Sequence, residues 1–285
     1  MPTTDPTTVG ALLAESRERL QRSGIEQPGL EARLLVGHQL EIADAGLLAF
    51  GERPVTARQA EAVRTLIAAR IAGQPIAYLL GRREFWSLPL QVDEGCLIPR
   101  PETELLVERA LGHLPAGPAR ALDLGTGSGA IALALKSERP QLEAWGSDVE
   151  AGALAVAAAN ARRLGLSVHW FRGRWLEAVA PRPVFDLIVG NPPYIAADDP
   201  HLAAGDLRFE PRGALVSADS GLADLRAIAE QARSRLKPGG WLLLEHGAEQ
   251  GSAVRALLRD AGCQEVSSHV DLAGLERMTE GRAAA

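Results

Sequence analysis

The stretch Asp123-Leu124-Gly125-Thr126-Gly127-Ser128-Gly129-Ala130 decides the fold, because it follows a short apolar run and opens a helical segment. Glycine permits a tight turn and leaves no Cβ between the backbone and a ligand. The free N–H groups at the start of the following helix favour a carboxylate. The stretch therefore predicts a ligand-binding loop between a strand and a helix.

Outward from this loop, short apolar runs alternate with helical segments. Strands are expected at 121–124, 144–147, 168–171, 185–189 and 241–244 and from Gln264, and helices from Ser128 and Glu150, over 221–236 and over 250–261. This alternation predicts an α/β fold with a doubly wound, mostly parallel sheet. Ligands of such sheets bind beyond the carboxyl ends of the strands, so the loops after strands one, two and four are the candidate site. The tail 282–285 is expected to fray.

The first eighty or so residues predict a small helical module. Thr56 to Gln59 has the form of a capping box. Two apolar stripes precede it at helical spacing: Val9, Leu12, Leu13 and Leu20, then Leu30, Leu34, Leu35 and Leu40. From Trp86 to Val92 the apolar period changes to two, and Pro89 restricts this segment to an edge strand or hairpin. We expect a helical domain at 1–82, a β-hairpin linker at 83–96 and the α/β domain at 97–285.

Composition excludes several classes of protein. Of 285 residues, 46% are hydrophobic and 23% charged, as in globular proteins. The amino-terminal segment does not have the form of a leader, and no stretch approaches the roughly 18 apolar residues that span a bilayer, so we expect a cytoplasmic protein. Two cysteines, Cys96 and Cys263, are too few for a disulfide framework and are expected to be buried structural thiols. Scattered histidines predict no metal site, and the net charge of −6 argues against tight nonspecific nucleic-acid binding.

The glycine loop alone leaves the cofactor open. Gly125, Gly127 and Ala130 also satisfy the dinucleotide fingerprint of nicotinamide enzymes. Asp148, 25 positions after Asp123, suits the ribose diol of either cofactor. The acidic Asp123 before the first glycine and the closer spacing through Gly129 favour S-adenosylmethionine.

Asn191-Pro192-Pro193-Tyr194, directly after the strand at 185–189, favours methyl transfer to a planar nitrogen. Consecutive prolines stiffen the turn and hold its polar groups toward the cleft. The Asn191 amide oxygen and the Pro192 carbonyl accept the two protons of an NH2 group, while Tyr194 packs on the planar group. Such electrostatic preorganisation is worth about 10²–10³ in rate, and the same acceptors repel a carboxylate.

These motifs resemble those of the protein-(glutamine-N5) methyltransferases that modify the Gly-Gly-Gln motif of bacterial peptide chain release factors. The matching stretches are 84–86, 97–104, 123–130, 191–194, 208–211, 244–247 and 271–277. The resemblance implies a helical N-terminal domain, a hairpin linker and a Rossmann-like, seven-stranded class I S-adenosylmethionine-dependent methyltransferase domain. It also implies class 1 release factors as partners. The N-terminal helices contain no chemistry of their own and are then expected to be the docking surface, and from composition and charge we expect neither membrane nor direct nucleic-acid binding.

Carried over residue by residue, the resemblance assigns a cofactor site and a substrate site. Gly125, Thr126, Gly127, Ser128 and Gly129 would line the methionine end of the cofactor, Asp148 its ribose and Trp175 its adenine. Asn191, Pro192, Pro193 and Tyr194 would hold the glutamine, with Asn191 also at the cofactor and with Asn191, Pro192 and Tyr194 as the catalytic groups. Arg174 departs from the family, which often has an acidic residue there, and puts the contact to the adenine amino group in doubt.

Several alternatives stay open. Glu102 and Thr103 either line the pocket near the methyl group or cap a helix, and 209–211 either shape the acceptor cleft or form a plain loop. A glutamine of a ribosomal protein, or an adenine of a nucleic acid, would present the same amide or amine geometry. A nicotinamide oxidoreductase and a nonenzymatic binding module are the remaining hypotheses.

Overall fold

A computed structural model describes residues 7–284 in two compact units, which divide between Gly81 and Arg82. The first unit is helical. It consists of α1 (Val9–Arg22), α2 (Pro28–Leu40), α3 (Asp44–Ala49), α4 (Ala57–Ile71) and α5 (Ile76–Leu80). The expected capping box is present, because the Thr56 hydroxyl accepts from the backbone of Gln59 and the Gln59 side chain accepts from the backbone of Thr56.

One of the two predicted apolar stripes was partly wrong. Leu30 and Leu34 are 42% and 39% exposed, while Ala32 and Val36 join Leu35 in the core of this unit. Leucine spacing alone was misleading here, because the buried face of α2 includes the small residue Ala32, where the helices pack closely. Leu30 and Leu34 lie outside that face.

The second unit begins with a β-hairpin of β1 (Arg82–Phe85) and β2 (Leu88–Gln91). Trp86 was expected to start the two-residue alternation but lies in the turn, where Trp86 and Ser87 have φ angles of 51° and 57°. Two successive left-handed residues are what a two-residue hairpin turn of the favoured hand requires. The backbone N–H of Trp86 donates to Glu104 Oε1 at 2.9 Å, which ties the turn to the rest of the unit.

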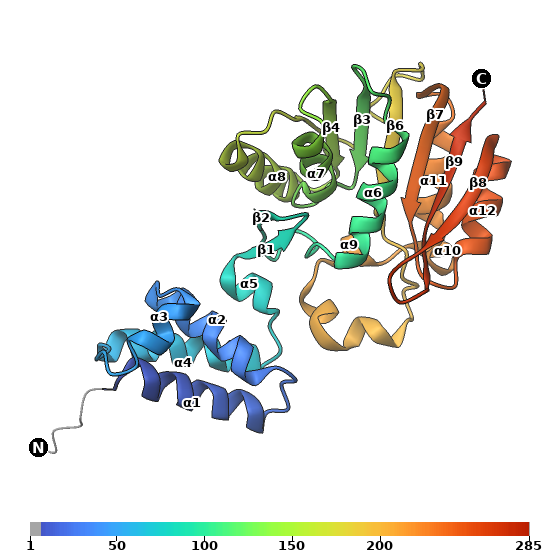
Figure 1. Ribbon diagram of the computed structural model, residues 1–285. Helices are drawn as coiled ribbons and strands as arrows, with labels where there is room; N and C mark the ends of the chain where they lie inside the picture. The colour runs from blue at the N-terminus through green and yellow to red at the C-terminus, as the bar shows by residue number, and fades with distance from the viewer. Residues whose placement is uncertain (1–6, 285) are drawn as a thin grey trace, which may run out of the picture. The chain divides into compact units, whose positions relative to one another are not determined.

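The main sheet confirms the expected seven-stranded, mostly parallel α/β fold (Figure 1). Its strands are β3 (Arg120–Leu124), β4 (Glu143–Asp148), β5 (His169–Arg172), β6 (Phe185–Gly190), β7 (Leu236–Glu245), β8 (Cys263–Val270) and β9 (Glu276–Ala283). Their order is β5-β4-β3-β6-β7-β9-β8, and β9 alone runs against the others. The sheet order reverses beside β3, so the loops after β3, β4 and β6 meet at one edge.

Helices cover both faces of the sheet, and the residues of each strand alternate between the two resulting cores. One face carries α6 (Glu104–His113), α7 (Ala130–Glu138) and α8 (Ala151–Leu164); the other carries α11 (Ala223–Ala232) and α12 (Gly251–Asp260). In β6, Leu187 and Val189 pack in the first core and Ile188 in the second. Short turns precede or connect these elements: η1 (Pro101–Thr103), η2 (Pro200–Ala203), η3 (Gly205–Phe209), α9 (Arg212–Leu215) and α10 (Ala218–Gly221).

Two predicted boundaries near the C-terminus were wrong. The helix expected over 221–236 ends at Ala232, and Leu236 instead starts β7, where it pairs with Phe185. The tail expected to fray includes Arg282, which lies in β9 opposite Trp241 and donates from its guanidinium to Glu265 at 2.8 Å. Pairing on both sides orders this segment; Ala285 lies outside the described residues.

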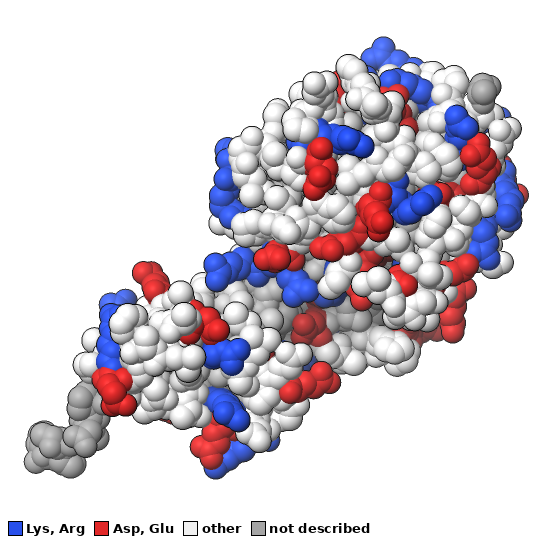
Figure 2. Space-filling view, in the orientation of Figure 1, with Lys and Arg blue, Asp and Glu red and all other residues white. Residues whose placement is uncertain are grey.

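Basic and acidic side chains are interspersed over the face of the second unit that Figure 2 shows. Some basic and acidic side chains of this unit form ion pairs, such as Arg226 with Asp219 at 2.9 Å. Among the described residues no helix is long and apolar enough to cross a bilayer.

Candidate active site

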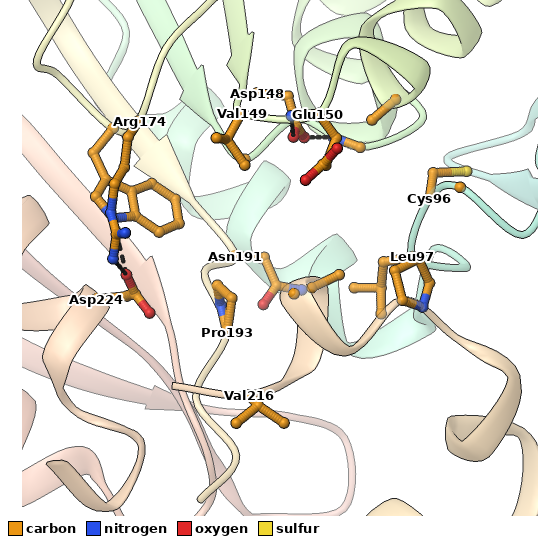
Figure 3. Close-up of a pocket in the computed structure, with 18 of the residues that line it drawn as sticks. Cys96, Leu97, Asp148, Val149, Glu150, Arg174, Asn191, Pro193, Val216 and Asp224 are labelled. Carbon is orange, nitrogen blue, oxygen red and sulfur yellow. Dashed lines mark hydrogen bonds and ion pairs between the residues drawn. The ribbon is translucent and has the colours of Figure 1, made fainter. Parts of the chain in front are cut away.

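A cavity of about 510 Å³ lies where β3, β4 and β6 end (Figure 3). Gly125 and Gly127 from the loop after β3, Asp148 from the end of β4 and Asn191 after β6 all line it. The cavity therefore lies at the switch in strand order that the β/α alternation predicted as the site.

The glycine loop has left-handed backbone at Gly125, Gly127 and Gly129, with φ angles of 65°, 56° and 87°. A Cβ at Gly129 would lie 3.1–3.2 Å from Leu133, Ala157 and Trp170, so this glycine also allows α7 to pack against its neighbours. At Gly127, by contrast, no atom lies within 4 Å of an added Cβ. The open side of the loop thus leaves its backbone accessible from the cavity.

Asp123, at the end of β3, is a buried carboxyl beneath this loop. Burial raises its pKa to about 7, although the Thr126 hydroxyl and the Ala132 N–H, which both donate to Oδ2, oppose the rise. Its other oxygen, Oδ1, has no hydrogen-bond partner among residues 7–284. An unpaired buried oxygen of this kind is costly. Asp123 does not line the cavity, so its carboxyl supports the loop from beneath.

Asp148, at the end of β4, faces the cavity and bonds to the backbone of the loops after β3 and β4. Its Oδ2 accepts from the Gly127 N–H at 2.9 Å, and its Oδ1 accepts from the Glu150 N–H at 2.9 Å. Burial raises its pKa, and these backbone bonds oppose the rise. Each carboxylate oxygen retains a lone pair, so the pair of oxygens matches a ribose diol.

Trp175 lies against the glycine loop in a left-handed conformation with φ of 50°. The nearest ring atom lies 3.3 Å from where a Cβ at Gly125 would be. Its indole N–H donates to Asp224 Oδ1 at 3.0 Å, and Arg174 forms an ion pair with the same oxygen at 3.2 Å. Since all three residues line the cavity, the aromatic ring, the guanidinium and the carboxylate form one wall of it.

The Asn191 side chain has a defined orientation. Its Nδ2 donates to the Thr103 hydroxyl at 3.3 Å, so its Oδ1 is directed elsewhere as an acceptor. Asn191 lines both the large cavity and a second cavity of about 50 Å³. The small cavity is mostly apolar and is bounded by Leu97, Arg100, Asn191, Pro192, Tyr194, Ile195, Leu207, Ala214 and Leu215. Asn191 thus stands at the junction of the large cavity and a narrow one of side-chain size.

Neighbouring segments fix the turn that carries Asn191. The Tyr194 carbonyl accepts from Gln250 Nε2 at 3.0 Å, and a Cβ at Gly221 would come within 2.1 Å of that carbonyl. Glu210 is buried, forms an ion pair with Arg100 and accepts from the Ile98 N–H at 3.1 Å. Glu210 therefore holds Arg100, which lines the small cavity, and Pro211 lines the large one. That this segment shapes an acceptor cleft stays a prediction.

Comparisons with known proteins identify the family. Residues 11–81 match the model of the PrmC N-terminal domain, and residues 101–208 match the methyltransferase small domain. The chain is 53% identical over 255 residues to a release factor glutamine methyltransferase of Bordetella pertussis, covering 89% of this chain and 94% of that protein. It is 47% identical to one of Vibrio cholerae, covering 96% of each.

The chain belongs to the release factor glutamine methyltransferase family. The fold is also that of a methyltransferase from Pyrococcus furiosus, with a TM-score of 0.54 at 18% identity over 81% of this chain and 100% of that one. The family match confirms the resemblance inferred from the motifs, and it supports S-adenosylmethionine over a nicotinamide as the cofactor.

The structure brings some of the predicted site residues together and leaves others aside. Gly125, Gly127, Asp148, Trp175, Asn191 and Pro193 line the large cavity, and Pro192 and Tyr194 line the small one. Thr126, Ser128 and Gly129 are not among the lining residues; the first two are buried side chains within the loop. Among residues 7–284, no group of three His, Cys, Asp or Glu side chains is placed to hold a metal ion.

Sequence reasoning missed Asp224 and gave Cys96 only a structural role. Asp224 lies inside α11 without any motif around it, and only the fold brings it to Trp175. Cys96 is buried, as expected, but it also lines the large cavity. Burial raises the pKa of its thiol to about 11, so it is neutral and unreactive in this wall.

Proposed function

We propose that this protein transfers a methyl group from S-adenosylmethionine to the side-chain amide nitrogen, N5, of the glutamine in the Gly-Gly-Gln motif of class 1 peptide chain release factors. The observation that carries the proposal is the orientation of Asn191, whose amide oxygen is left as an acceptor at the junction of the two cavities. Relatives that are about half identical over nearly the whole chain are named for this activity.

The large cavity fits the cofactor. Asp148 offers two oxygens to the ribose diol, Trp175 an aromatic face to the adenine, and the loop from Gly125 to Gly129 an accessible backbone to the methionine end. S-adenosylmethionine, when bound, supplies an electrophilic methyl group.

The turn from Asn191 to Tyr194 binds and orients the acceptor amide. Asn191 Oδ1 and the Pro192 carbonyl each accept one proton of the glutamine NH2, which draws the nitrogen lone pair out of conjugation and toward the cofactor cavity. Tyr194 packs on the planar amide in the small cavity. No prior deprotonation is needed, since the methylated nitrogen releases its proton to solvent late.

The N-terminal helices would dock the protein substrate, with the domain boundary near the start of the hairpin and the catalytic domain after 96. A protein that methylates release factors would act in the cytoplasm.

A glutamine of a ribosomal protein is the second candidate acceptor, because the small cavity recognises the side-chain amide and not the protein to which it belongs. An adenine N6 acceptor is disfavoured by the net charge of −6, which does not favour contacts to many phosphates.

Mass spectrometry of the acceptor tests the proposal. Unmethylated release factor, a ribosomal protein preparation and duplex DNA are each incubated with the protein and S-adenosylmethionine. A single methyl group on the Gly-Gly-Gln glutamine is the expected result. Methylation of another acceptor, with the release factor unchanged, would overturn the substrate while leaving the cofactor in place.

A further inference from the structure

Gln250 lies at the end of the loop after β7, directly before α12, and its side-chain amide makes three hydrogen bonds to backbone groups. Oε1 accepts from the Gly247 N–H at 2.9 Å, and Nε2 donates to the carbonyls of Tyr194 at 3.0 Å and Ser220 at 3.3 Å. A backbone N–H only donates and a carbonyl oxygen only accepts, so these three partners fix the orientation of the amide. Gln250 lines neither cavity, so it acts on the site only through the residues that it binds.

The turn from Asn191 to Tyr194 depends on groups outside it for its position. Its two consecutive prolines have no N–H group, and their fixed φ angles leave the turn few alternative conformations. At one end Gly190 is paired with both neighbouring strands, β3 and β7. At the other end the Tyr194 carbonyl accepts from Gln250. Because both ends are held and the middle is stiff, the hydrogen bond from Gln250 fixes the direction of the polar groups between them.

A strained backbone segment closes around the same carbonyl. Asp219, Ser220 and Gly221 are all left-handed, with φ angles of 55°, 53° and 87°. Such conformations are costly for residues other than glycine and persist where the surrounding contacts hold them. A Cβ at Gly221 would lie 2.1 Å from the Tyr194 carbonyl oxygen and 2.7 Å from Gln250 Nε2. The segment thus presents the Ser220 carbonyl to Gln250 and packs Gly221 against the carbonyl that Gln250 holds.

We infer that Gln250 is a positioning residue for methyl transfer, because its amide holds the Tyr194 carbonyl at the end of the turn. Holding this end keeps Asn191 Oδ1 and the Pro192 carbonyl directed at the acceptor amide. This inference rests on the proposed function of these two acceptors. It goes beyond that function by assigning their alignment to a residue in the loop after β7 that lines neither the cofactor cavity nor the acceptor cavity.

Gln250→Met and Gln250→Glu both nearly preserve the length of the side chain and remove the two donated hydrogen bonds. Methionine also removes the acceptor of the Gly247 N–H, whereas an ionised glutamate retains it. We expect kcat to fall at least ~10-fold in both variants, since a small displacement of reacting groups costs up to about 10²-fold in rate. The Kd for S-adenosylmethionine should stay within about twofold, because Gln250 does not line the cofactor cavity. A smaller fall of kcat in either folded variant, or an equal loss of cofactor affinity, would overturn the inference.

Gln231→Glu is the matched control for the added charge. Gln231, in α11, accepts from the Leu176 N–H through Oε1 at 3.0 Å, a hydrogen bond that glutamate retains. Its kcat should stay within about twofold of wild type. A loss equal to that of Gln250→Glu would assign the effect to the charge and contradict the inference. Thermal unfolding of all three variants identifies those that are folded, and the neutral Gln250→Met keeps the test decisive if Gln250→Glu does not fold.

An NMR readout of the Tyr194 carbonyl needs no substrate. The chain has two tyrosines, Tyr78 and Tyr194, and only Tyr194 precedes an isoleucine. Tyrosine labelled with ¹³C at the carbonyl and isoleucine labelled with ¹⁵N therefore assign the Tyr194 signal by its coupling to Ile195. A carbonyl carbon that loses a hydrogen bond is less deshielded, so this signal should move upfield in both Gln250 variants and stay in place in Gln231→Glu. The Tyr78 signal, from the helical unit, is the internal reference.

The same spectra separate this inference from the proposed function. If wild type leaves release factor unmethylated while the Tyr194 signal moves as expected, the proposed function fails and the anchoring of the turn by Gln250 stands. An unmoved Tyr194 signal in either folded Gln250 variant overturns the inference, whatever the turnover.

Discussion

The indole N–H of Trp175 donates a 3.0 Å hydrogen bond to Asp224 Oδ1 and so joins the segment after β5 to helix α11 across one wall of the large cavity. The same carboxylate accepts from Arg174 at 3.2 Å and, through Oδ2, from Ser217 at 2.7 Å. The family often has an acidic residue at the position of Arg174. In this chain Asp224 instead places a carboxylate beside the proposed adenine site.

Asp224→Ala should weaken cofactor binding. The substitution removes the hydrogen bond that fixes Trp175 and leaves Arg174 unpaired in the wall. A hydrogen bond to a charged group is worth about 1.5–3 kcal/mol, so Kd should rise about tenfold or more. Titration calorimetry with S-adenosylmethionine measures this. Arg174→Ala is the control, because its side chain is 62% exposed and should contribute much less. Equal effects of the two substitutions would contradict the role given to Asp224.

A release factor with glutamate in place of the Gly-Gly-Gln glutamine should not be methylated. Asn191 Oδ1 and the Pro192 carbonyl would face carboxylate oxygens instead of N–H donors. Polar mismatches in a site built for a hydrogen-bonded group lower kcat/KM by about 10⁴. Methyl incorporation from labelled S-adenosylmethionine checks this, and comparable incorporation into both proteins would exclude the two-acceptor geometry.

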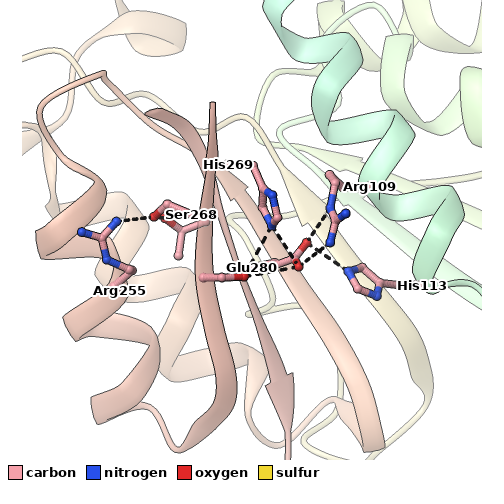
Figure 4. Close-up of polar contacts among 8 residues, drawn as sticks. Arg109, His113, Arg255, Ser268, His269 and Glu280 are labelled. Atoms are coloured by element: carbon pink, nitrogen blue, oxygen red, sulfur yellow. Dashed lines mark hydrogen bonds and ion pairs between the residues drawn. The ribbon is translucent and has the colours of Figure 1, made fainter. Parts of the chain in front are cut away.

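A buried network around Glu280 in β9 should govern stability in acid (Figure 4). Its carboxylate accepts from Arg109 at 2.7 Å and bonds His113 at 3.0 Å, both in α6, and bonds His269 in β8 at 3.0 Å. Burial alone would raise the pKa of Glu280, but these hydrogen bonds lower it from 4.5 to about 2. The network therefore ties α6 to the β8–β9 edge only while Glu280 is ionised.

Because the folded-state pKa lies below the unfolded value, this stabilisation is complete above about pH 5 and is lost as the pH falls toward 2. Glu280→Gln should lower the free energy of unfolding by about 2–3 kcal/mol at neutral pH, since it removes the charged partner of Arg109 from a largely buried site. The difference in unfolding free energy from wild type should shrink as the pH falls. Glu265→Gln, which removes the exposed partner of Arg282, should change stability by less than about 1 kcal/mol. A Glu280 variant with the same acid profile as wild type would contradict this account.

The parts of the site that are contiguous in the chain were predictable from sequence. The loop from Gly125 to Gly129 and the turn from Asn191 to Tyr194 each follow a strand, and parallel strands bring such loops to one edge. The contacts of Asp224 with Trp175 and of Thr103 with Asn191 were not predictable, since each joins residues far apart in sequence and no motif states the partner.

Strand β9 (Glu276–Ala283) was not among the strands expected from apolar alternation, which placed only one strand, from Gln264, after residue 261. Glu280 in β9 is charged yet 3% exposed, because Arg109, His113 and His269 compensate it. Hydrophobic periodicity therefore underestimates how deeply this segment is buried. Leu30 and Leu34 are the opposite case. They are apolar, so periodicity predicts that they are buried, but they lie on a face that the helical unit does not bury.

The turnover of Asn191→Ala on unmethylated release factor, measured with cofactor affinity on the same preparation, tests the central claim most directly. If Asn191 Oδ1 accepts a proton of the glutamine amide, kcat should fall at least ~10²-fold while the Kd for S-adenosylmethionine stays nearly unchanged. Unchanged turnover would contradict the account, and a parallel loss of cofactor binding would place Asn191 in the cofactor site alone.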